Sequence, residues 1–73
     1  MRIYLELIEA AGEELAEADF IRVDVTDWSD SDVNSAVDLL KQQATVYEHY
    51  ILQRHYCYHD EGKSCTAEII DSK

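Results

Sequence analysis

The chain has no proline, only two glycines and only two cysteines among its 73 residues. Without a stretch rich in proline, glycine or serine the sequence offers no linker, so we expect a single domain over residues 1–73. Two cysteines are too few for a disulfide framework and can form one bridge at most. A chain of this length lies near the lower limit at which a hydrophobic core alone holds a fold.

Positive charge is also scarce, because six lysines and arginines face sixteen acidic residues and the net charge is −10. This balance disfavours direct binding to a nucleic-acid backbone or to an anionic membrane. No apolar run approaches the length of a membrane span, and Glu6 lies where a signal peptide would keep its apolar segment. We therefore expect a cytoplasmic protein, or one in the host cytoplasm if it is encoded by a phage.

Motifs for catalysis are missing. No serine or cysteine is accompanied by a recognisable base, and no glycine-rich phosphate loop is present, so we expect no enzyme. Asp30-x-Asp32-x-Asn34 matches the first three ligand positions of an EF-hand calcium loop. Ser35 and Lys41 then stand where that loop needs glycine and a bidentate glutamate, so we interpret the acidic pair as helix capping.

Hydrophobic periodicity predicts two strands in the first half of the chain. Residues 2–9 alternate with Ile3, Leu5 and Leu7 on one face, although leucine and glutamate leave a helix as the alternative. Residues 19–26 form the clearest strand, and we expect the core to take its odd-numbered face. Residues 13–18 between them suit a loop or one turn of helix.

A helix is predicted next, beginning near Asp30. Ser29 followed three residues later by Asp32 resembles a capping box in which aspartate replaces the usual glutamate. The expected buried stripe has helical spacing and consists of Val33, Ala36, Val37, Leu40 and Ala44.

The last third of the sequence predicts a β-hairpin around Gly62, from residues 45–59 and 65–70. A three-residue loop with Gly62 left-handed would set His59 opposite Lys63, Cys57 opposite Cys65, and Arg54 opposite Glu68. A two-residue loop would instead set Arg54 against Ile69. The predicted fold is α+β, in the order β-β-α-β-β, with one antiparallel sheet and a helix on one face.

Histidine and cysteine gather on the predicted hairpin. His49, His55, Cys57 and His59 occupy odd positions of one strand, and Cys65 falls across from Cys57. These are zinc donor types, but His55 and His59 would lie about 13 Å apart on an extended strand, so one ion could use only one of them. We expect no cofactor, with a free or bridged cysteine pair as the interpretation and a zinc-stabilised hairpin as the alternative.

Negative charge is concentrated at the start of the chain. The first 32 residues hold ten acids and two arginines, a net charge of −8, and the other 41 hold six acids and four bases, a net charge of −2. Such a field selects cationic partners. We therefore expect a small protein-binding inhibitor or adaptor that docks on a basic, nucleic-acid-binding protein as a nucleic-acid mimic. Small anti-CRISPR and anti-restriction proteins of phages are similar in size and charge.

The expected contact residues are the exposed acids of this region together with one aromatic residue of the hairpin strand: Glu13, Glu14, Glu17, Asp19, Asp24, Asp27, Asp30, Asp32 and Tyr47. Two alternatives use the charge differently. The chain could be a homodimeric scaffold that pairs edge strands or a tyrosine and histidine face. The acidity could also serve only solubility or adaptation to high salt.

Overall fold

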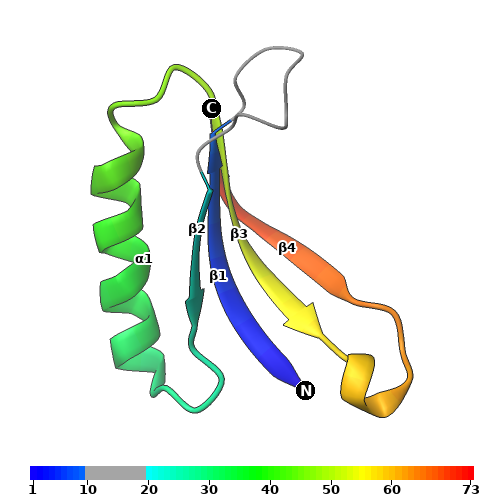
Figure 1. The fold of residues 1–73 in the computed structure, drawn as a ribbon. Coiled ribbons are helices and arrows are strands. Elements are labelled where there is room, and N and C mark those ends of the chain that lie inside the picture. The colour runs from blue at the N-terminus through cyan, green and yellow to red at the C-terminus, as the bar shows by residue number, and fades with distance from the viewer. Residues whose placement is uncertain (10–19) are drawn as a thin grey trace.

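The computed structural model describes residues 1–9 and 20–73. Its elements, in chain order, are β1 (Arg2–Glu9), β2 (Phe20–Asp24), α1 (Asp30–Ala44), β3 (Tyr50–Cys57), the 3₁₀ turn η2 (His59–Glu61) and β4 (Thr66–Ser72). The four strands form one antiparallel sheet in the order β2-β1-β3-β4, and α1 covers one of its faces (Figure 1). The predicted α+β fold and its β-β-α-β-β order are confirmed.

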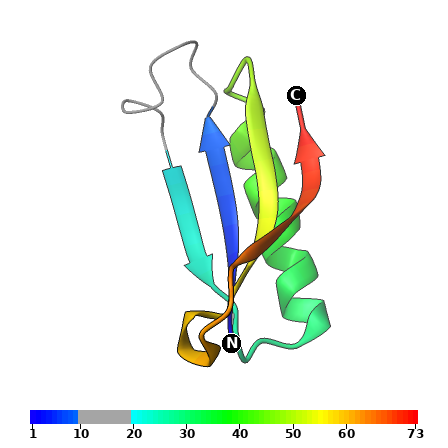
Figure 2. The same ribbon diagram turned by 90° about the vertical axis from the view of Figure 1, so that its right-hand side faces the viewer.

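The core lies between α1 and the sheet. Period-two alternation puts Leu5 and Leu7 of β1 and Leu52 of β3 on the helix-facing side, where all three are fully buried. Residues 2–9 form a strand despite their helix-favouring composition, because β1 is central and pairs with β2 on one side and β3 on the other. Three residues of the predicted helical stripe, Val37, Leu40 and Ala44, are buried against it. Figure 2 shows the sheet lying across α1.

The helix begins as expected. Ser29 is its N-cap, and its side-chain oxygen accepts a hydrogen bond from the backbone N–H of Asp32 at 3.2 Å. This bond satisfies one of the amide groups that have no partner in the first turn of a helix. Among the described residues no helix is both long enough and apolar enough to cross a membrane.

From Gln53 to Tyr56 the hairpin has the register predicted for the three-residue loop, with Arg54 opposite Glu68, and the pairing shifts by one residue at Leu52. Gly62 is left-handed, with φ 67°. The expected pairing of His59 with Lys63 is wrong, because β3 ends at Cys57 and His59 enters η2. Lys63 instead donates its backbone N–H to the carbonyl of Tyr58 at 3.1 Å. A turn of 3₁₀ helix therefore replaces the last predicted strand pairs.

Candidate functional site

Trp28 lies on the connection from β2 to α1, and 45% of it is exposed. Two hollows lie beside it, one along the edge of α1 and one at the end of the core. A tryptophan left this exposed next to two concave surfaces is typical of a protein-binding site, because large amphipathic side chains are enriched at interfaces.

The larger hollow is a groove of about 590 Å³ between β2 and α1. Its lining is Val23, Asp27, Trp28, Ser29, Asp32, Ser35, Ala36, Leu39 and Leu40. Leu40 also reaches the core, whereas Leu39 is 66% exposed and belongs to no core cluster. The lining therefore combines apolar side chains with two carboxylates and includes no basic residue.

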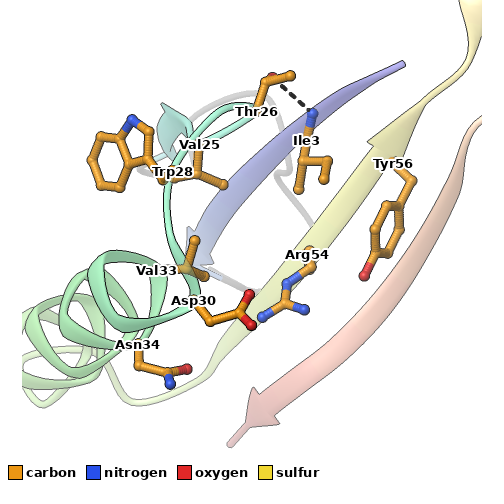
Figure 3. A pocket seen from close by; sticks show the side chains of 9 residues that line it. All are labelled: Ile3, Val25, Thr26, Trp28, Asp30, Val33, Asn34, Arg54 and Tyr56. Atoms are coloured by element: carbon orange, nitrogen blue, oxygen red, sulfur yellow. Dashed lines mark hydrogen bonds between the residues drawn. The ribbon is translucent and has the colours of Figure 1, made fainter.

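The smaller hollow, of about 390 Å³, opens between the sheet and the first turns of α1 (Figure 3). The guanidinium of Arg54 points toward the carboxylate of Asp30 there. Neither residue forms an ion pair within the described part of the chain, and Arg54 Nε is buried without a hydrogen-bond partner. Because this hollow carries charges of both signs, it suits a cationic partner less well than the groove does.

The described acids around the groove differ in what they already do for the fold. Asp24 pairs with Arg2 at 2.9 Å, and hydrogen bonds from Thr26 lower the pKa of its carboxyl. Asp30 and Asp32 occupy the first turn of α1, where they suit the positive end of the helix dipole. Asp27 is exposed and has no side-chain hydrogen bond or ion pair to any other described residue. Of the two groove carboxylates, Asp27 is therefore the one that neither the helix terminus nor a contact within the described part of the chain engages.

Not all of the expected contact residues lie within the described structure. Glu13, Glu14, Glu17 and Asp19 fall outside it, whereas Asp24, Asp27, Asp30 and Asp32 lie at the end of β2 and the start of α1. Tyr47 is only 9% exposed and packs in the hydrophobic core. This corrects the expectation that Tyr47 offers a contact surface, because the chain after α1 turns back onto the core before β3 begins.

The expected metal ligands separate into two groups. Cys57, His59 and Cys65 come together at the end of the hairpin. His55 instead contacts Glu6 through its Nδ1 at 3.1 Å, on the sheet face that α1 does not cover. The three-residue cluster is therefore the one expected site whose ligand atoms the fold gathers.

Glu6 is a buried charged residue whose partners the sequence does not indicate. It is 2% exposed and accepts hydrogen bonds from Arg22 Nε at 2.8 Å and Gln53 Nε2 at 2.7 Å. Its neighbours belong to β2 and β3, and both lie directly opposite it in the sheet register. Only knowledge of the strand order would have predicted this network, because it joins three strands that are not all consecutive in sequence.

The face of the sheet away from α1 carries exposed apolar groups, including Phe20 and Ile69. The guanidinium carbon of Arg22 lies 5.0 Å from the ring centroid of Tyr4 and 5.2 Å from that of Phe20. These stacked contacts fix Arg22 over Glu6. No described element covers this face, which is one of the two surfaces that the homodimer alternative would use, the other being the edge strands.

No family model, curated protein or solved structure matches this chain.

Proposed function

We propose that this protein is a small protein-binding domain that docks on a basic partner through the groove beside Trp28. The partner inserts an apolar anchor between Trp28 and Leu39 and pairs lysine or arginine side chains with the carboxylates of the rim. The observation that carries the proposal is the composition of the groove, which is apolar inside, bordered by Asp27 and Asp32, and lined by no cation.

The charge of the chain supports a partner that normally binds nucleic acid. A net charge of −10 on 73 residues creates a field that attracts cationic surfaces and speeds their association. Surfaces that bind a phosphate backbone are rich in lysine and arginine. Docking through the groove would occupy such a surface, so the protein would act as a competitive inhibitor of nucleic-acid binding.

The apolar part of the groove gives this proposal a feature that charge mimicry alone lacks. Exposed ion pairs contribute little to affinity and are screened by salt. Burial of Leu39 and Trp28 under a partner adds a hydrophobic contribution to the binding free energy, about 25 cal/mol per Å² of apolar area, which salt does not screen. We therefore expect salt to weaken the complex and mutation of Leu39 to weaken it at every salt concentration.

The first test is capture of partners on immobilised protein, from lysate of the source or host, with elution in salt steps. The expected result is a basic nucleic-acid-binding protein that excess duplex DNA displaces, identified by mass spectrometry and confirmed with purified components. If DNA displaces none of the retained proteins, the nucleic-acid-mimic part of the proposal is wrong.

A matched pair of charge reversals then tests the groove itself. Asp27→Lys changes a groove carboxylate that has no partner in the described structure, and Asp38→Lys makes the same change on an exposed helix position outside the groove lining. We expect Asp27→Lys to weaken binding of the purified partner at least tenfold and Asp38→Lys to change it by less than about threefold, as for a peripheral charge. Equal losses would show that only net charge matters and would remove the groove from the proposal.

A further inference from the structure

The end of the β-hairpin brings two cysteines and a histidine together. Cys57 is the last residue of β3, His59 begins η2, and Cys65 directly precedes β4. His59 Nδ1 lies 3.3 Å from Cys57 Sγ and 4.0 Å from Cys65 Sγ, and its Nε2 lies 3.4 Å from Cys65 Sγ. One ligand atom from each residue can be chosen so that all lie within 4.8 Å of one another.

These distances match the spacing of ligands around a tetrahedral zinc ion. With Zn–S bonds of about 2.3 Å and Zn–N bonds of about 2.0–2.1 Å, a sulfur and a nitrogen ligand stand about 3.6 Å apart. The two distances from His59 Nδ1, 3.3 and 4.0 Å, bracket that value. Two thiolates and one imidazole are also the donor set that selects zinc over calcium or magnesium.

We propose that Cys57, His59 and Cys65 form a zinc-binding site that closes the open end of the hairpin. Binding one Zn²⁺ displaces the protons of the two thiols to solvent and leaves the imidazole neutral, with its Nδ1 as the donor. The ion would link the end of β3, the turn η2 and the start of β4.

The turn explains why one histidine joins the cysteines and the other does not. An extended strand would carry residue 59 about 7 Å beyond residue 57. The 3₁₀ turn η2, which ends at the left-handed Gly62, bends the chain so that the ring of His59 contacts both sulfurs. The geometry of the site therefore depends on the same turn that replaced the predicted His59–Lys63 pair.

Among residues 1–9 and 20–73, no fourth side chain joins the three ligand atoms of the cluster. A hollow of about 180 Å³ borders the cluster and is lined by Arg2, Cys57, His59 and Asp60. This volume holds a water molecule, whose share of liquid volume is about 30 Å³. Asp60 already accepts a hydrogen bond from the amino group of Met1 at 2.8 Å. Water, or an exogenous thiolate or imidazole, would therefore complete the tetrahedron.

A disulfide is the competing use of the two cysteines. Both are free thiols in this structure. A disulfide would bring the sulfurs to about 2.05 Å and would require an oxidant. It would also leave the contacts of His59 with both sulfurs without a role, whereas coordination uses all three residues.

The test is a titration of the reduced, metal-free protein with Co²⁺, followed by displacement with Zn²⁺. We expect one Co²⁺ per chain, the intense visible bands of a tetrahedral site, and a near-ultraviolet thiolate charge-transfer band whose intensity fits two Co–S bonds. Zn²⁺ should abolish all of these bands. A protein with two titratable thiols that shows no such spectrum would overturn the proposal.

Variants assign the ligands. Cys57→Ser, Cys65→Ser and His59→Ala should each weaken metal binding by more than about tenfold. Loss of a residue that only hydrogen-bonds to a metal ligand already weakens binding by about 10–100-fold, so loss of a ligand itself should cost at least as much. His49→Ala is the matched control, because His49 is exposed and precedes β3. Equal affinity of His59→Ala and His49→Ala would contradict the assignment of His59. If a cysteine variant fails to fold, the band intensity of the unmodified protein still counts the thiolates.

Discussion

At the scale of single residues, Glu6 is the one buried charged side chain in the described part of the chain. Burial alone would raise the pKa of its carboxyl, but the hydrogen bonds from Gln53, His55 and Arg22 outweigh burial and lower that pKa below its usual range. A lowered folded-state pKa means that the carboxylate stabilises the fold fully above its unfolded pKa. This stability is lost as the pH falls through the folded pKa.

We predict that Glu6→Gln lowers the free energy of unfolding at pH 7 by about 1–3 kcal/mol. Arg22 would lose its charged partner, and the N–H group introduced at position 6 would face the N–H donors that now bind the carboxylate. The difference from the unmodified protein should shrink between pH 7 and pH 3, because below the ordinary pKa of a glutamate the unfolded chain takes up a proton and part of the stability that ionised Glu6 supplies is lost. Urea unfolding at the two pH values measures both effects, with the exposed Glu48→Gln as control. A loss of equal size at both pH values would assign the effect to packing rather than to charge.

The burial of Glu6 and of Tyr47 could not be predicted from sequence, because both depend on how the elements of the fold pack together. Alternation put Glu6 on the face opposite Leu5 and Leu7, and that placement is correct. Its burial follows from Arg22 and Gln53, which only the strand order β2-β1-β3 brings beside it. The strand predicted over residues 45–59 includes Tyr47, but the turn after α1 directs its side chain into the core.

At the scale of elements, local signals predicted the start of α1 because the capping bond joins residues three positions apart. We predict that Ser29→Ala lowers the free energy of unfolding by about 1 kcal/mol, the usual cost of removing an N-cap side chain. For a domain of this size that loss lowers the melting temperature by about 4–8 °C. Thermal unfolding followed by circular dichroism measures it.

Ser31→Ala is the matched control for this prediction. Ser31 is exposed in the first turn of α1, and its hydroxyl makes no hydrogen bond to any other described residue, although its backbone carbonyl accepts one from the hydroxyl of Ser35. Alanine at that position should leave the stability unchanged or raise it slightly, because alanine has the higher helix propensity. A similar loss in both variants would contradict the capping explanation.

The hairpin shows where element-level prediction from sequence ends. Gly62 and the opposite charges of Arg54 and Glu68 were enough to select the correct register. They could not predict η2, because alternation and charge pairing carry no information about the backbone turn that replaces the strand at His59–Glu61. The proposed zinc cluster therefore differs from the sequence-based set in the loss of His55, which the Glu6 network holds elsewhere.

At the scale of the whole molecule, the uneven distribution of charge has an energetic consequence for the free protein. The described chain has a radius of gyration of 12.8 Å. In 10 mM salt the Debye length is about 30 Å, so carboxylates across the whole molecule repel one another. The same negative charge that attracts a basic partner therefore opposes the folded state.

We predict that salt acts in opposite directions on folding and on partner binding. Raising NaCl from 10 mM to 0.5 M should raise the melting temperature by several degrees, because screening relieves the repulsion within a chain of net charge −10. The same increase should weaken the complex with a basic partner, because screening removes the attraction between them. Calorimetry of the free protein and a binding titration over one salt series measure both.

A melting temperature that falls with salt would show that the ion pairs of Glu6 and Asp24 dominate the electrostatics. Partner affinity that does not change with salt would make the acidity a matter of solubility rather than recognition.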